Sequence, residues 1–188
     1  MTIDRSRYEK AVRRNLAELN NAILKRRALI GLQSAKSAHS LDFFTIASDA
    51  LFNDVVAHAI LVLDQNGQSA SFWYVYRCDE GLVRKFAKRR DISLDRLSDL
   101  SKRFKIIRDE THFHIDRDGV MNPSEVWSRA SITGNDLGWA LEAAYDVLAD
   151  IQESVTGTRP SVAEYDGKDA AAIVRAYKAQ HPEAKIVV

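Results

Sequence analysis

Apolar residues recur at helical spacing through most of this chain, in segments too long for strands. Between residues 3 and 33 they follow one another three, four or seven positions apart, at Tyr8, Val12, Leu16, Leu19, Ile23 and Ile30. Residues at these spacings share one face of an α-helix. The 188 residues include only 8 glycines and 3 prolines, too few for a sheet built from many turns. The pattern predicts an all-α protein.

Three more long segments are expected to be helical. Residues 40–64 are apolar on more than one face, which is typical of a helix in the middle of a bundle or at a subunit interface. A third helix is expected to begin after Ser93, which suits a helix N-cap. The last starts at Thr133 or Asn135 and ends before Gly157. Four long helices predict an up-and-down four-helix bundle.

Short helical insertions are predicted between these long helices. The aromatic run at 72–76 could pass for a strand by itself. Because its neighbours on both sides are helical, it is interpreted as the start of a short helix packed on the second one. Another short helix is expected over 79–90, and a third begins at Pro123 and stops near Ala130.

The composition changes beyond Pro160, where a C-terminal helical tail is predicted. Asp166 is expected to cap an alanine-rich helix that continues to about Gln180. This tail is either docked on the bundle or held by a partner. The sequence therefore predicts a bundle domain over residues 1–158 and a C-terminal extension over residues 159–188.

Charge and cysteine content exclude several classes of protein. The net charge of +1 gives no general preference for polyanions, so nucleic acid would have to bind a local basic patch. Cys78 is the single cysteine, which excludes an intrachain disulfide and a cysteine-rich zinc site. Residues 1–10 are charged and lack the apolar core of a signal peptide, and no apolar run is judged long enough to span a membrane. A cytoplasmic protein is expected.

An arginine and two histidines lie within seven residues at the end of the third helix. Arg108 is a fixed cation that suits phosphate, and His112 and His114 can move protons near neutral pH. The buried stripe of this helix is Leu97, Leu100, Phe104 and Ile107. Continued in the same register it reaches Thr111 and His114. His114 is therefore expected to face a neighbouring helix or a partner subunit.

The densest basic patch lies earlier, over residues 84–90. Its five cations are Arg84, Lys85, Lys88, Arg89 and Arg90. Most runs of this kind are solvated helix faces. The patch is a candidate RNA-binding surface if the fold brings it beside Arg108.

The spacing of the arginine and histidine resembles the HEPN superfamily of helical-bundle proteins. Its ribonuclease signature is Arg, a following Asn, Asp or His, and a His after four to six intervening residues. Here Asp109 follows Arg108, and five residues separate Arg108 from His114. A helix over Leu51 to Asp64 followed by Ser71-Phe72-Trp73 is similar to the abortive-infection branch of the superfamily. The resemblance covers roughly residues 5–157.

The resemblance implies a metal-independent endoribonuclease, needing no cofactor, whose composite cleft forms between two copies of the chain. Arg108 would bind or orient the scissile phosphate of an RNA substrate, and His114 would act as general acid or base. Asp109 would orient one of them, and His112 would play a supporting role. The branch implies a toxin or phage-defence protein with an antitoxin or regulatory partner.

Other interpretations of the same residues remain open. Arg108 and His114 could form an interhelical polar pair, with Glu110 or Asp116 neutralising either one. The chain could also be a catalytically silent module that dimerises and binds a nucleotide or a protein. A metal site of His112, His114 and Asp116 is disfavoured, because no fourth ligand is evident. A further histidine, His58, is interpreted as a hydrogen-bonded core residue.

Overall fold

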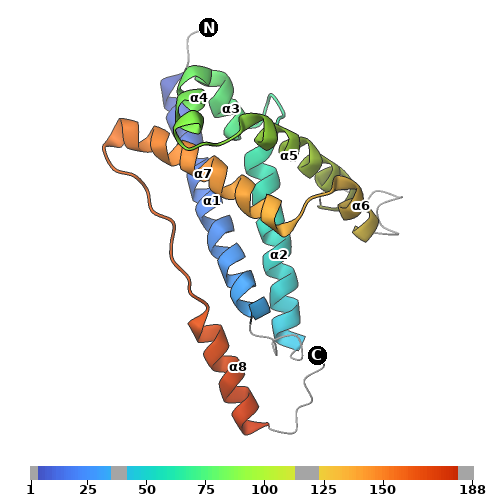
Figure 1. Ribbon diagram of the computed structural model, residues 1–188. Helices are drawn as coiled ribbons and strands as arrows, with labels where there is room; N and C mark the ends of the chain where they lie inside the picture. Colours follow the sequence, from blue (N-terminus) through green and yellow to red (C-terminus); the bar gives the residue numbers. More distant parts are fainter. Residues whose placement is uncertain (1–3, 35–41, 113–122, 182–188) are drawn as a thin grey trace.

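The computed structural model describes residues 4–34, 42–112 and 123–181. All regular secondary structure in these residues is helical, which confirms the all-α prediction. Two long helices, α1 (Arg5–Ser34) and α2 (Asp42–Leu63), lie side by side and run in opposite directions (Figure 1). Buried residues such as Leu19 on α1 and Val56 on α2 hold the pair together through the main apolar core.

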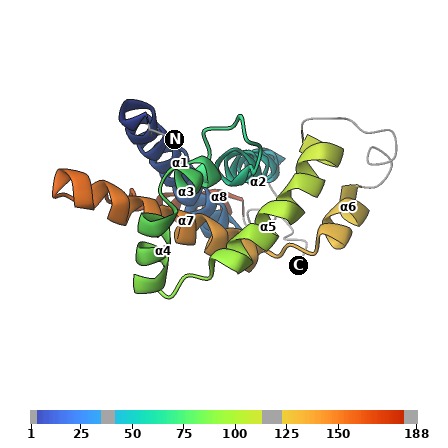
Figure 2. The same ribbon diagram turned by 90° about the horizontal axis from the view of Figure 1, so that it is seen from above.

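The other two long helices pack at the upper end of this pair. The helix α7 (Gly134–Thr156) crosses the upper half of the pair, and α5 (Leu94–Ile107) packs at the upper end of α2 and against α7 (Figures 1 and 2). The face that α7 buries is rich in small residues, including Ala140 and Ala144, so its backbone can approach α1 closely. The predicted up-and-down four-helix bundle is not confirmed, although its four long helices are present.

The short helices have the predicted positions. The aromatic run begins α3 (Phe72–Cys78) and is helical rather than extended. It is followed directly by α4 (Glu80–Arg89), and α6 (Pro123–Ala130) begins at the predicted proline. The packing of Trp73 on α3 agrees with the interpretation of this run as a short helix packed on its neighbours. Its ring is buried in the main core, and its Nε1 donates to Ser101 Oγ of α5 at 2.9 Å.

Strong local signals fix both ends of α7. Thr133 and Asp136 form a capping box, in which each side chain binds the other residue's backbone N–H. At the other end Gly157 has φ 74°, the left-handed conformation that glycine adopts at little cost. The sequence predicted both boundaries.

The tail forms α8 (Lys168–Gln180), which packs beside α1. Its N-cap is Gly167 rather than the predicted Asp166, whose Oδ1 accepts from the backbone N–H of Lys168 at 3.1 Å. A second apolar cluster, separate from the main core, joins the tail to α1 and α2. Its buried members are Leu32, Phe44, Ala170 and Val174. The tail is therefore docked on the long helix pair, which was one of the two predicted alternatives.

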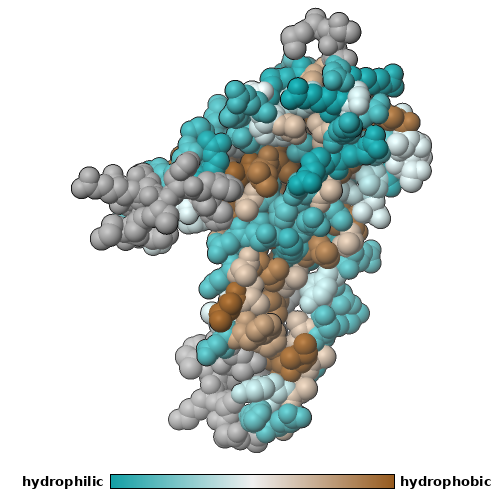
Figure 3. Space-filling view, turned by 180° about the vertical axis from the view of Figure 1, so that it is seen from behind, coloured by the Kyte–Doolittle hydropathy of each residue, from teal (hydrophilic) through white to brown (hydrophobic). Residues whose placement is uncertain are grey.

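The helix α2 keeps much apolar surface exposed. Phe43, Ile46 and Leu61 are 73%, 67% and 53% exposed. On the face seen in Figure 3, hydrophobic surface gathers over the lower half of the molecule. Among the described helices α2 is long and apolar enough to cross a membrane by length and composition alone, contrary to the prediction that no run reaches that length. Eight of its residues are nevertheless buried against the rest of the fold.

Candidate functional site

The candidate motif begins where α5 changes its helical geometry. Ser93 caps α5 as predicted, and Leu97, Leu100, Phe104 and Ile107 are all buried. The next residues form a π-helical turn, η2 (Arg108–His112). Such turns are rare and frequently occur at functional sites. A π-turn holds more residues than an α-turn, so positions after Ile107 leave the α-helical register.

This change of register removes a premise of the argument that assigned His114 to the buried stripe. Thr111, the first position beyond Ile107 in that argument, is half-buried, and its Oγ1 donates to Ile107 O at 2.8 Å. The extrapolation from Ile107 to His114 required an uninterrupted α-helix. His114 itself lies outside the described residues, as does Asp116.

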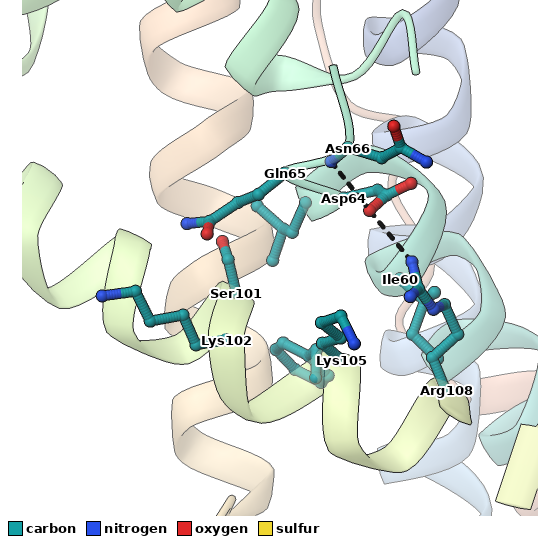
Figure 4. Close-up of a pocket in the computed structure, with 10 residues that line it drawn as sticks. Ile60, Asp64, Gln65, Asn66, Ser101, Lys102, Lys105 and Arg108 are labelled. Carbon is teal, nitrogen blue, oxygen red and sulfur yellow. Dashed lines mark hydrogen bonds and ion pairs between the residues drawn. The ribbon is translucent and has the colours of Figure 1, made fainter. Parts of the chain in front are cut away.

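Arg108 is held by two carboxylates from different parts of the chain. Its Nε donates to Oδ1 of Asp109 at 2.7 Å, and its Nη1 donates to Oδ1 of Asp64, just after α2, at 3.0 Å. The same Asp64 oxygen accepts from the backbone N–H of Asn66 at 3.1 Å, so the turn fixes the carboxylate (Figure 4). The guanidinium is therefore oriented before any ligand arrives.

The two acids change the protonation equilibria of this cluster. The hydrogen bond to Asp109 is the main reason that the pKa of Arg108 is raised above its ordinary value. Burial by itself would raise the pKa of Asp109, but hydrogen bonds from Arg108 and Lys105 outweigh it and hold that pKa below its usual value. Arg108 and Asp109 are therefore both charged at neutral pH.

Arg108 forms an interhelical ion pair with Asp64, whereas the predicted partner His114 and the acid Asp116 lie outside the described residues. Glu110 binds Arg129 of α6 instead of Arg108. Asp64 is the residue that connects Arg108 to another helix. No local sequence signal joins these two residues, because they are 44 positions apart.

Beside Arg108 lies a pocket of about 350 Å³ between the end of α2 and α5 (Figure 4). Its apolar lining consists of Ile60, Leu63 and Phe104. Its other lining residues are polar or charged: Asp64, Gln65, Asn66, Ser101, Lys102, Lys105 and Arg108. A pocket with an apolar wall and a few converging cations suits a small anionic ligand that also has a flat or apolar part.

Two of the three cations of this pocket are already paired. Lys105 binds Asp109, and Arg108 binds both Asp64 and Asp109. Neither bond of Arg108 uses its Nη2. No carboxylate pairs with Lys102 in the part of the chain that the structure describes. Lys102, Lys105 and Arg108 recur every three residues, a spacing that places them near one another on a helix and could have revealed this face from the sequence.

The basic patch over residues 84–90 lies toward the other end of α5 from Arg108 (Figure 2). The 14 residues of α5 separate the two, a rise of about 21 Å along a helix. Arg90 binds the buried Asp150 of α7 with two hydrogen bonds, of 2.7 and 3.0 Å, and Arg89 approaches the same carboxylate. Arg84 binds Glu80 at 2.7 Å. Lys85 and Lys88 are exposed.

His58 lies in a network of charged side chains between α1 and α2. Its Nδ1 is 2.7 Å from Glu18 Oε2, and its Nε2 is 3.2 Å from both Lys25 Nζ and Asp54 Oδ2. His58 is therefore hydrogen-bonded as predicted, but it is half-buried in a charged network rather than placed in the apolar core. The two carboxylates contact opposite ring nitrogens, so they do not converge on one point as metal ligands would. No potential metal-binding cluster of His, Cys, Asp and Glu occurs within residues 4–34, 42–112 and 123–181.

Comparisons with protein-family models, with curated proteins and with solved structures find no match for this chain.

Proposed function

We propose that the chain is a metal-independent endoribonuclease of the HEPN type. The observation that carries the proposal is the fixed position of Arg108, which borders a cation-lined pocket and makes both of its observed bonds through Nε and Nη1. Its Nη2 is then the group that would meet a phosphate oxygen. In this proposal α1, α2, α5 and α7 are the counterparts of the four bundle helices of that superfamily.

The chemistry follows from the residue types. A general base removes the proton from a ribose 2′-hydroxyl, whose oxygen attacks the adjacent phosphorus while the bond to the 5′-oxygen breaks. The leaving oxygen takes a proton from a general acid, and the products are a cyclic phosphate and a 5′-hydroxyl. His114 supplies one of these proton transfers, and Arg108 stabilises the charge that develops on the phosphate. Asp109 orients Arg108, and His112 has a supporting role.

The proposal includes a homodimer with the two Arg108 sites close together. Leu61 supports this choice of surface, because it is 53% exposed on the last turn of α2, next to the Asp64 that binds Arg108. A toxin or phage-defence role in the cytoplasm, and control by an antitoxin or regulatory partner, belong to the same proposal.

The test is an RNA cleavage assay in the presence of a chelator. Wild-type protein is expected to cut single-stranded RNA, and Arg108→Ala and His114→Ala are expected to lose at least about 100-fold in rate. Arg103→Ala is the matched control, because Arg103 is on the same helix, pairs with Asp99 and does not line the pocket. Circular dichroism checks that each variant is folded. Activity that disappears with the chelator, or that survives in Arg108→Ala, contradicts the proposal.

One observation favours a second candidate, a catalytically silent module that binds a nucleotide. Two carboxylates already neutralise Arg108, which suits a positioning or structural role for the arginine as well as a catalytic one. This candidate predicts nucleotide binding that Lys102→Ala weakens, with no cleavage of any RNA by the wild-type protein.

A further inference from the structure

A second pocket lies next to the Arg108 pocket along α5. Its volume is about 370 Å³, and Gln65, Trp73, Tyr76, Arg77, Arg84 and Ser98 are among its lining residues. Gln65 lines both pockets. Ser98 in the second pocket and Lys102 in the first are four residues apart on α5, so about one helical turn separates the two.

Gln65 forms the wall between the two pockets. Its side-chain Nε2 donates to Ser98 O at 3.2 Å and to Ser98 Oγ at 3.0 Å, which ties the turn after α2 to α5. Trp73 of the second pocket donates to Ser101 of the first, so Gln65 and this buried contact together separate the two pockets. A ligand that fills both pockets has to pass over Gln65.

Each pocket has an exposed cation without a carboxylate partner among the described residues. In the first pocket this is Lys102. In the second it is Arg77, whose guanidinium donates weakly to the backbone carbonyls of Gln65 at 3.5 Å and Asn66 at 3.3 Å. These contacts place Arg77 against the turn that carries the wall, so the two cations lie on either side of Gln65.

The second pocket also has surfaces that suit a base and a ribose. The half-buried ring of Tyr76 forms part of its wall, with the guanidinium of Arg84 over it, 5.5 Å from its centre, and Trp73 lines the pocket from the main core. Asp95 is the carboxylate in the lining. A carboxylate accepts hydrogen bonds from ribose hydroxyls or base amino groups and repels phosphate.

We propose that the two pockets together bind a single RNA strand, with one nucleotide in each and the connecting phosphate over Gln65 between Lys102 and Arg77. The inference rests on the proposed ribonuclease function and specifies where its RNA substrate binds along α5. Each pocket has the volume of a small-ligand site, about 300–1,000 Å³, which admits one nucleotide and excludes a duplex. Single strands are bound by this combination of cations and ring surfaces.

The test measures the binding of an RNA octamer with 2′-O-methyl groups throughout, which the proposed mechanism cannot cut. Arg77→Ala and Lys102→Ala are each expected to weaken binding in fluorescence anisotropy. Each is also expected to reduce the dependence of log affinity on log salt by about 0.7, the value for one lost contact to a single-strand phosphate. Arg77→Lys keeps the charge and should keep the salt dependence, a result that a merely structural role for Arg77 would not produce.

The matched controls are Arg175→Ala on α8 and Lys10→Ala on α1, exposed cations outside both pockets. The inference is overturned if the octamer does not bind, or if Arg77→Ala and Lys102→Ala change the salt dependence no more than these controls do. Cleavage of unmodified RNA is measured separately. If RNA binding depends on both cations but no RNA is cleaved, the two-pocket binding site is supported and the proposed ribonuclease function is rejected. If RNA is cleaved but its binding does not depend on Arg77 and Lys102, the two-pocket binding site is rejected and the ribonuclease function stands.

Discussion

Arg108 Nη1 donates to Asp64 Oδ1 at 3.0 Å and thereby joins the end of α5 to the end of α2. Both side chains are partly buried, 25% and 22% exposed, so solvent screens their interaction only in part. The bond forms one side of the Arg108 pocket and orients the arginine that the proposed chemistry uses. Its strength can be measured.

A double-mutant cycle on Asp64→Ala and Arg108→Ala isolates this pair. Each single variant is expected to lower the free energy of unfolding by about 1 kcal/mol, with a coupling energy of about 0.5–1 kcal/mol. Urea unfolding followed by circular dichroism gives the values. The exposed pair Asp99 and Arg103 on α5 is the control cycle, with an expected coupling of about 0.3 kcal/mol. Equal coupling energies in the two cycles would show that the Asp64–Arg108 pair is no stronger than an exposed ion pair.

Removal of the Asp150 carboxylate is expected to destabilise the fold most. Asp150 is 1% exposed and binds Arg90 and Arg159, so Asp150→Asn leaves the partly buried Arg90 without its carboxylate and Arg159 with Asp146 alone. The expected loss is about 3 kcal/mol in urea unfolding, because a buried ion pair with Arg90 is broken even though Arg159 keeps Asp146. Asp146→Asn is the matched control, because Asp146 binds the same Arg159 from a more exposed position and should cost less than about 1 kcal/mol.

The same residue predicts a pH dependence. Burial by itself would raise the pKa of Asp150, but the hydrogen bond from Arg90 and the charges of Arg159 and Arg89 outweigh it and hold that pKa below 3.8. The unfolded chain then binds more protons than the folded one as pH falls through this range. The stabilisation is therefore present above pH 3.8 and is lost below it. Between about pH 5 and pH 3 the wild type should lose more stability than Asp150→Asn. Parallel pH profiles would contradict this.

A close approach of two glycines permits the docking of the tail. A Cβ added to Gly31 of α1 would lie 3.2 Å from the Cα of Gly167, the residue that caps α8. Gly31→Leu is therefore expected to displace α8, and amide hydrogen exchange over residues 168–180 should become faster while α7 stays protected. Gly134→Ala is the control, since a Cβ there meets nothing within 4 Å. Unchanged exchange in α8 would show that the tail tolerates the larger side chain.

The dimer surface is tested by Leu61→Asp. A charge in place of an exposed leucine should change the stability of the monomer little, but it opposes burial at a dimer interface. The variant is expected to be monomeric in light scattering and to lose the proposed RNA cleavage, with its helical content unchanged. Phe43→Asp, at the opposite end of α2, should leave the dimer intact. If Phe43→Asp dissociates the dimer and Leu61→Asp does not, the dimer interface lies at the other end of α2.

Local signals predicted most of the helices, because they act within a few residues. Thr133 and Asp136 are three positions apart, and Gly157 terminates α7 through its own backbone conformation. Ser93 and the stripe from Leu97 to Ile107 likewise depend only on residues of α5. The prediction failed at Arg108, where the register changes to a π-turn although no nearby residue signals it.

The sequence by itself determined that this protein is all-helical, where most helices begin and end, and that Arg108 and Asp109 lie at the end of a helix. Only the tertiary structure decided that α7 crosses the α1–α2 pair and α5 packs on α2, that Asp64 holds Arg108, and that Gln65 lies between two pockets. The physical reason is distance along the chain. Helix caps and apolar periodicity are local, whereas the Arg108 site depends on side chains that only the packing of α2 against α5 brings together.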